Sequence, residues 1–190
     1  MYQKYNTEAL VLGSRESGES DRTVALFTRD FGLVYARATS VRSEHSKMRY
    51  ATQHYTQALV SLVKGKRGWR LAGASALRIA GADVKGVAAF ARVSELTVRL
   101  IHGEEHNAYL FEVLSEAHAA LMREKVEAYA TIEIVCVARV LYALGYLSAE
   151  ALETALFTHT AYTGEHLLEA ETMRDKLLSS INRAIGETQL

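Results

Sequence analysis

A short basic segment with a tryptophan is the part of this sequence best suited to binding a polyanion. Lys64-Gly65-Lys66-Arg67-Gly68-Trp69-Arg70 lies between two runs of alternating apolar residues. Two glycines three positions apart indicate a tight hairpin turn, because glycine reaches positive φ without steric cost. Cations at the tip of such a hairpin would bind phosphates, and Trp69 would offer a ring on which a base could stack. The alternative is a solvated hairpin whose Trp69 packs on a neighbouring strand.

More cations precede this hairpin, in an alternating run and in the polar segment that follows it. From Leu33 to Thr39, small residues share one face, which leaves Tyr35 and Arg37 on the other. Tyr35 would then be a stacking ring beside a phosphate ligand, although half-buried packing of this ring is an equal alternative. The segment from Ser43 to Tyr50 is expected to be a loop or a mobile arm. We predict a nucleic-acid surface in which Arg37, Arg42, Lys47, Arg49, Lys64, Lys66, Arg67 and Arg70 bind phosphates, with Tyr35 and Trp69 as possible stacking rings.

The distribution of charge supports this surface. The formal net charge of the 190 residues is +0 at pH 7. Residues 1–78 nevertheless hold 13 Lys and Arg against 6 Asp and Glu, a charge of +7, and residues 79–190 hold 9 against 16, a charge of −7. Such an asymmetry suggests that one half of the chain meets a polyanion and the other does not.

Other chemistries find little support. His102 and His106 are four residues apart, but Gly103 follows the first histidine where a zinc-protease helix needs glutamate, so an exposed loop is expected. The single Cys136 lies in a strongly apolar segment, where a thiol is un-ionised. We therefore expect no enzyme, no metal and no cofactor. A metal-dependent nuclease would need clustered carboxylates near the basic face, for which the only candidates are Glu16, Glu19 and Asp21.

Five short strands are expected in the first part of the chain. They are placed at residues 8–15, 21–29, 33–41, 53–64 and 69–79. Hairpin connections and one longer loop between the third and fourth strands suit the five-stranded OB-fold barrel, whose fourth-to-fifth loop helps to bind single strands. An SH3-like barrel or an open meander fits the same pattern.

Helical periodicity begins near Asp83, a candidate N-cap. Further helices are expected at residues 109–122, at 131–144 with Gly145 as the terminating residue, from Ser148 to Phe157, and at 169–185. The predicted class is therefore α+β, with an OB-fold DNA-binding domain at residues 1–80 followed by an all-α helical domain at residues 81–190. A lone cysteine excludes an intramolecular disulfide, and neither a signal sequence nor an 18-residue apolar run is present. A cytoplasmic, nucleoid-associated location is expected.

The first 80 residues resemble the bacterial RecO family of recombination mediators. The resemblance rests on Glu8-Ala9-Leu10-Val11-Leu12, on the run from Glu19 to Gly32, and on Val34 to Ser46 with its basic loop. In the helical half it is loose, limited to helix order and Leu144-Gly145-Tyr146. The resemblance implies an OB-fold followed by helices, and binding of single- and double-stranded DNA. It also implies strand annealing and recombinase loading together with RecR, RecA and single-strand-binding protein in recombinational DNA repair.

Two features depart from that family. Ser40 stands where a glycine usually precedes the basic loop, and one cysteine cannot form the four-cysteine zinc site that some members carry. We predict a non-enzymatic DNA-binding recombination mediator. The alternative is a protein-interaction adaptor whose OB-fold no longer binds DNA.

Overall fold

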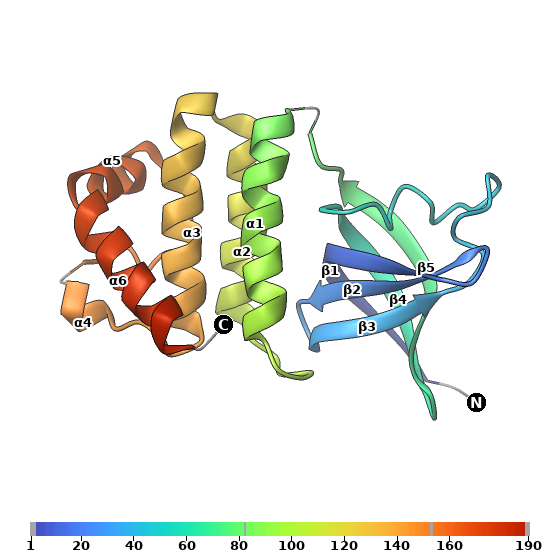
Figure 1. The fold of residues 1–190 in the computed structure, drawn as a ribbon. Helices are drawn as coiled ribbons and strands as arrows, with labels where there is room; N and C mark the ends of the chain where they lie inside the picture. Colours follow the sequence, from blue (N-terminus) through green and yellow to red (C-terminus); the bar gives the residue numbers. More distant parts are fainter. Residues whose placement is uncertain (1–2, 82, 153, 189–190) are drawn as a thin grey trace. The chain divides into compact units, whose positions relative to one another are not determined.

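A computed structural model describes residues 3–81, 83–152 and 154–188. Its first part is a closed barrel with the strand order β1-β2-β3-β5-β4 (Figure 1). The strands are β1 (Lys4–Ser17), β2 (Asp21–Thr28), β3 (Gly32–Ala38), β4 (Gln57–Gly65) and β5 (Gly68–Arg78). Each strand pair is antiparallel except β3 with β5, which run parallel and close the barrel. The predicted five-stranded OB-fold barrel is confirmed.

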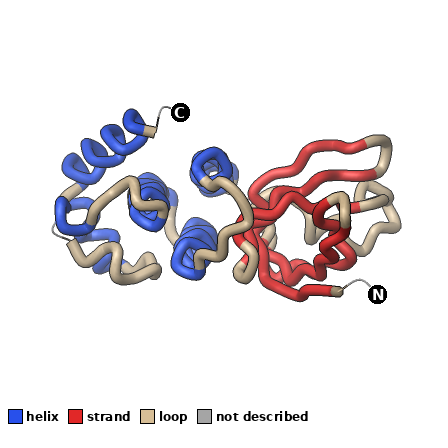
Figure 2. Tube along the Cα trace, turned by 90° about the horizontal axis from the view of Figure 1, so that it is seen from below, coloured by secondary structure: helices blue, strands red, loops and turns tan. Residues whose placement is uncertain are grey.

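Small and branched side chains fill the interior of the barrel. The strands form a ring around this core (Figure 2). On β3, Val34, Ala36 and Ala38 are buried, whereas Tyr35 and Arg37 are exposed. This alternation follows from the pleat of a strand, which sends successive side chains to opposite faces. The outward orientation of Tyr35 and Arg37 that the sequence predicts is therefore confirmed.

β3 ends earlier and β4 begins later than the sequence predicts, so the connection between these strands is longer than expected. β3 ends at Ala38 and β4 begins at Gln57, because Ser40 and Tyr55 have φ values of 52° and 62°. These left-handed conformations interrupt a strand. The connection is not a mobile arm, since Val41 and Ala51 are buried in the barrel core and Met48 packs against it.

The second part of the chain is helical. Its elements are α1 (Val84–Leu100), α2 (Ala108–Arg123), the short 3₁₀ helix η1 (Val126–Ala128), α3 (Tyr129–Ala143), α4 (Ala149–Leu152), α5 (Gly164–Thr172) and α6 (Arg174–Glu187). The Asp83 carboxylate caps α1 by accepting hydrogen bonds from the backbone N–H groups of Lys85 and Gly86. α3 contacts α1, α5 and α6, and Gly145 follows its end with a φ of 79°. The predicted cap and terminating glycine are confirmed.

Two helix predictions were wrong. The helix expected from Ser148 to Phe157 is reduced to the four residues of α4, and a turn occupies residues 156–158. The single helix expected over 169–185 is two helices, because Met173 leaves helical geometry at φ −112° and ψ 17°. α5 also begins earlier than predicted, where the Thr163 hydroxyl accepts the N–H of His166.

The chain divides into two compact units. One contains the chain up to Ala80 together with His102–Ala108, and the other contains Gly81–Ile101 and the chain from Tyr109 onwards. The segment between α1 and α2 thus belongs with the barrel. At Gly32 a Cβ atom would lie 2.1 Å from the Glu105 carbonyl oxygen, so this close approach requires glycine.

An arginine with no carboxylate partner in the described part of the chain is buried in the helical unit. Arg139 on α3 is 0% exposed. Its Nε donates to the carbonyl of Leu156, and its Nη1 donates to the carbonyls of Thr160 and Ala161, all within 2.9–3.0 Å. The guanidinium also lies 4.7 Å from the centre of the Tyr162 ring. One side chain thus fixes the segment between α4 and α5 by donating hydrogen bonds to carbonyls that lie outside both helices.

Replacing this arginine should lower stability strongly. Arg139→Ala removes a donor from each of the carbonyls of Leu156, Thr160 and Ala161 and creates a cavity, so the free energy of unfolding should fall by about 3 kcal/mol or more. Chemical denaturation of both proteins measures the difference. The control is Arg174→Ala, which breaks only an exposed ion pair with Glu171 and should cost under about 0.5 kcal/mol. Equal effects of the two changes would contradict this role for Arg139.

Candidate nucleic-acid interface

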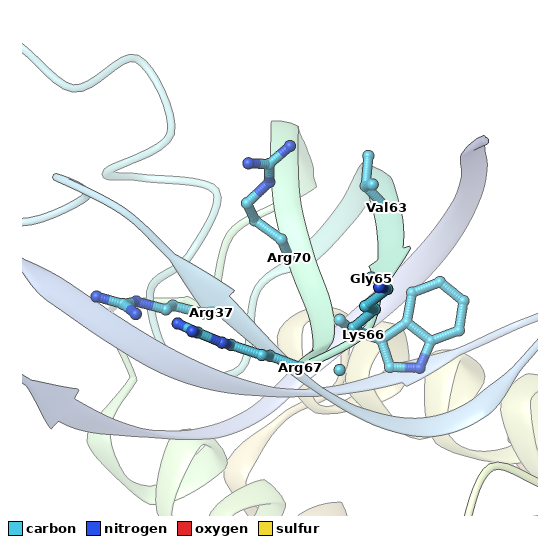
Figure 3. Close-up of a pocket in the computed structure, with 8 residues that line it drawn as sticks. Arg37, Val63, Gly65, Lys66, Arg67 and Arg70 are labelled. Atoms are coloured by element: carbon cyan, nitrogen blue, oxygen red, sulfur yellow. The ribbon is translucent and has the colours of Figure 1, made fainter. Parts of the chain in front are cut away.

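A hollow of about 410 Å³ lies on the outside of the barrel where β3, β4 and β5 meet (Figure 3). Four of the predicted phosphate ligands line it. The complete lining is Arg37, Val63, Gly65, Lys66, Arg67, Gly68, Trp69 and Arg70. The hollow is therefore basic on several sides and contains no acidic residue in its lining.

Backbone register places two of these arginines side by side. Arg37 on β3 is the parallel partner of Arg70 on β5, and Arg70 is the antiparallel partner of Val63 on β4. Partners in register point to the same face, so all three side chains point away from the barrel core, with Val63 covered and the two arginines exposed. Two cations thus stand on neighbouring strands of one face, and both line the hollow.

The hairpin between β4 and β5 supplies the other two cations. Gly65 and Gly68 are the last paired residues, which leaves Lys66 and Arg67 as a two-residue turn. Gly68 has a φ of 99°. A left-handed residue of this kind suits glycine, and the predicted hairpin is confirmed. Lys66 and Arg67 are exposed, and in Figure 3 the side chain of Arg67 extends in the same direction as that of Arg37.

A carboxylate from the neighbouring strand orients Arg37. Asp21 accepts hydrogen bonds from Nε and Nη2 of Arg37 at 3.1 and 2.8 Å, and from the backbone N–H of Ser40 at 2.8 Å. The Ser40 N–H and the Arg37 guanidinium lower the pKa of Asp21 below its ordinary value, in that order of importance. Asp21 thereby stabilises the left-handed backbone of Ser40, at the position where the resemblance leads one to expect glycine.

The eight predicted phosphate ligands do not all remain available. Arg37, Arg42 and Lys64 form ion pairs with Asp21, Glu16 and Glu104 respectively. The other five are exposed and have no carboxylate partner among the described residues; they are Lys47, Arg49, Lys66, Arg67 and Arg70. Three of these five lie at the hollow, and Lys47 and Arg49 lie in the connection between β3 and β4.

The proposed stacking role of Trp69 is not supported. Its ring is only 7% exposed, and it packs edge-on at 5.7 Å from Tyr5 and tilted at 5.4 Å from Phe31. The reason is strand parity, because Trp69 and Leu71 point into the barrel whereas Arg70 points out. Tyr35, in contrast, is 54% exposed and remains a candidate stacking ring.

Lys64 must also be separated from the hollow. It is the register partner of Trp69, so it points away from the outer face, and its Nζ lies 5.0 Å from the centre of the Trp69 ring. The same nitrogen lies 2.7 Å from Oε2 of Glu104, in the segment between α1 and α2. The sequence did not reveal this partner, since nothing in a local pattern connects residues 40 positions apart. We therefore leave Lys64 out of the proposed surface.

The remaining candidate sites are not assembled in the described part of the chain. No group of three or more His, Cys, Asp or Glu residues in residues 3–81, 83–152 and 154–188 could hold a metal ion. Burial raises the pKa of the Cys136 thiol to about 12. Glu16 and Asp21, two of the three carboxylates considered for a nuclease, are paired with arginines. None of the described helices has the length and apolar character needed to span a membrane.

A closed five-stranded barrel with cations on its third strand and on its fourth-to-fifth hairpin belongs to the OB class, which binds oligonucleotides and oligosaccharides on these elements. Comparison with known proteins makes the family specific. Residues 1–79 match the family model described as "Recombination protein O N terminal". Residues 1–79 are therefore similar to the N-terminal part of RecO proteins, which agrees with the resemblance found in the sequence.

Named relatives agree with this assignment. The chain is 47% identical over 62 residues to the DNA repair protein RecO of Desulfitobacterium hafniense, and 44% identical over 62 residues to that of Heliobacterium modesticaldum. Each alignment covers 33% of this chain and 23% of the relative. The RecO of Bacillus mycoides is 28% identical over 120 residues, which cover 60% of this chain and 46% of the relative. The chain thus spans less than half the length of these relatives.

The ion pair of Lys64 and Glu104 can be tested by titration. The hydrogen bond from Lys64 is the main cause that lowers the pKa of Glu104 below its ordinary value of 4.5. A carboxylate with a lowered pKa stabilises the fold above its unfolded-state pKa, and this contribution is lost as the pH falls through the folded-state value. In Lys64→Met the pKa of Glu104 should rise toward 4.5, which NMR titration of the side-chain carboxyl measures. An unchanged pKa would contradict the pairing.

Proposed function

We propose that this protein binds DNA through the outer face of its barrel and acts in recombinational DNA repair. The observation that carries the proposal is the adjacent Arg37–Arg70 pair, extended by Lys66 and Arg67 around one hollow. Phosphate oxygens neutralise such a group of cations and release counterions from the nucleic acid. Because these contacts go to the backbone, binding should depend little on sequence.

The exposed aromatic ring beside the hollow favours single strands. Tyr35 stands two positions before Arg37 on the same outer face of β3. Gly68, which precedes the Ala36 partner Trp69 on β5, has open space where a side chain would stand. An unpaired base can approach a ring that is exposed in this way, whereas a base inside a duplex cannot present its face to it. Duplex DNA would then be held by the cations alone.

The wider function follows from the family. The named relatives are DNA repair proteins, and the RecO resemblance implies strand annealing, recombinase loading and action together with RecR, RecA and single-strand-binding protein. A protein that holds single strands by their phosphates without enzymatic chemistry suits such a mediator. Because this chain spans only part of its relatives, these activities and partners are proposed for it and require direct tests.

Salt dependence tests the basic hollow. Each phosphate contact to a single strand contributes about 0.7 to the slope of log K against log salt. Changing Arg37, Lys66, Arg67 and Arg70 together to Gln should flatten the slope by up to about 3 and weaken binding. Fluorescence anisotropy with a labelled oligonucleotide at several salt concentrations measures both quantities.

A matched variant controls for net charge. Lys85, Arg99, Lys125 and Arg183 are exposed cations of the helical unit. Changing these four to Gln removes the same charge and should leave the slope nearly unchanged. If both quadruple variants lower the slope equally, the effect is one of net charge, and the hollow is not the site. If the unaltered protein binds no oligonucleotide, the adaptor function replaces the proposal.

The ring of Tyr35 should contribute without affecting salt dependence. Stacking of one base is worth about 1–3 kcal/mol, so Tyr35→Ala should weaken single-strand binding by about 5- to 150-fold. Tyr35→Phe keeps the ring and should bind nearly as the unaltered protein does. Anisotropy titrations of single-stranded and duplex oligonucleotides give the comparison. Equal losses for both forms of DNA would show that Tyr35 supports the fold of the strand and not a base.

A further inference from the structure

We infer that the connection between β3 and β4 carries a second base-stacking site, formed by Tyr50 with Lys47 and Arg49. This inference rests on the proposed function and extends it from the barrel face onto the loop. Tyr50 is 62% exposed, more than Tyr35, and cations stand immediately before it and three positions before it. The segment is thus able to hold a base as well as wrap a phosphate backbone.

The loop is built to hold these side chains in place. Residues on one side of it, Val41 and Ala51, are buried in the barrel core, and Met48 packs against that core. Consecutive turns follow, in which the N–H groups of Ser43, Ser46 and Arg49 each donate to the carbonyl three residues earlier. The Thr52 hydroxyl adds bonds to the carbonyls of Met48 and Arg49. A long loop with this much internal structure is commonly functional.

Both ends of the loop are fixed to the barrel. At one end the N–H of Arg42 donates to the Ser20 carbonyl at 3.1 Å, beside the turn between β1 and β2. At the other end the N–H of Tyr55 donates to the carbonyl of Val11 at 2.7 Å, and the N–H of Val11 donates to the carbonyl of Thr56 at 2.9 Å. An aromatic ring on such a scaffold is already positioned, so binding a base to it would require little additional ordering.

Exposed side chains occupy the opposite side of the same segment. Lys47, Arg49 and Tyr50 are all exposed, and neither cation has a carboxylate partner among the described residues. Isolated exposed tyrosines are ordinary in proteins. This one differs because it is exposed in the same short, core-anchored segment as two exposed cations. Cation and ring side by side are the elements of single-strand binding.

The chain itself links this site to the hollow. Arg37 lines the hollow one residue before the end of β3, and Ser40 of the loop follows three positions after it. Asp21 binds both the guanidinium of Arg37 and the N–H of Ser40, so the end of the strand and the start of the loop are held by one carboxylate. We propose that a single strand crosses the Arg37–Arg70 face and continues onto the loop, where Tyr50 stacks on one of its bases.

Removing the ring and removing the bases should reveal the contact. The probes are an oligothymidylate and an oligonucleotide of equal length made of abasic nucleotides, which has the same phosphates but no rings. Tyr50→Ala should weaken binding of oligothymidylate by about 5- to 150-fold, with an unchanged salt slope and no effect on the abasic strand. Tyr50→Phe should bind nearly as the unaltered protein does. Tyr146→Ala, which removes a 40% exposed ring from the helical unit, should have no effect.

The outcomes separate this inference from the proposed function. If the unaltered protein and Tyr50→Ala bind oligothymidylate equally, the second stacking site does not exist, while DNA binding by the barrel stands. If Tyr50→Ala weakens both probes equally, the residue shapes the loop and does not contact a base. If the unaltered protein binds neither probe, the proposed function fails first, and an exposed tyrosine among cations then marks a protein-binding surface.

Discussion

The short parallel pairing between β3 and β5 is the constraint on which the candidate site depends. Only two register pairs join these strands, and they close a barrel whose other seams are antiparallel. One pair is Ala36 with Trp69, both turned into the core, and the other is Arg37 with Arg70, both turned outward. The same closure that buries the tryptophan therefore brings two arginines together. Burial of apolar surface on one face of the sheet thus determines where the cations stand on the other.

Some of the predicted cations form ion pairs with carboxylates, and others do not. Asp21, Glu16 and Glu104 each neutralise one cation, whereas Lys66, Arg67 and Arg70 keep their charge beside the hollow. Exposed ion pairs of this kind contribute little stability, so their main effect is on geometry and on the local field. Asp21 shows this best, because it fixes the direction of Arg37 and the conformation of Ser40 at once. The predicted cations that have no carboxylate partner among the described residues therefore lie on β5 with its hairpin and on the loop after β3.

Much of this arrangement could be predicted from local pattern, and the exceptions have physical causes. Alternation on β3 correctly gave Tyr35 and Arg37 an outward face, and paired glycines gave the hairpin. Trp69 was misjudged because composition at the tip was weighed above strand parity, which sends Trp69 and Arg70 to opposite sides. Lys64 was predicted to bind phosphate, and its ion pair could not be foreseen, since its partner Glu104 comes from a distant connection between helices. The ends of β3 and β4 depend on left-handed residues at Ser40 and Tyr55, where neither residue type signals that conformation.

Cations and aromatic rings would make different contributions to the recognition of DNA. In the proposed interface the cations of the hollow would bind phosphates, which single strands and duplexes share, so they would set affinity and its dependence on salt without discriminating between the two. The rings of Tyr35 and Tyr50 would stack on exposed base faces, which only single strands offer. Both rings stand beside unburied cations on backbone that is held by core packing or by Asp21. Discrimination in favour of single strands therefore needs no contact that reads a base sequence, and it should survive any change that spares the two rings and the loop beneath them.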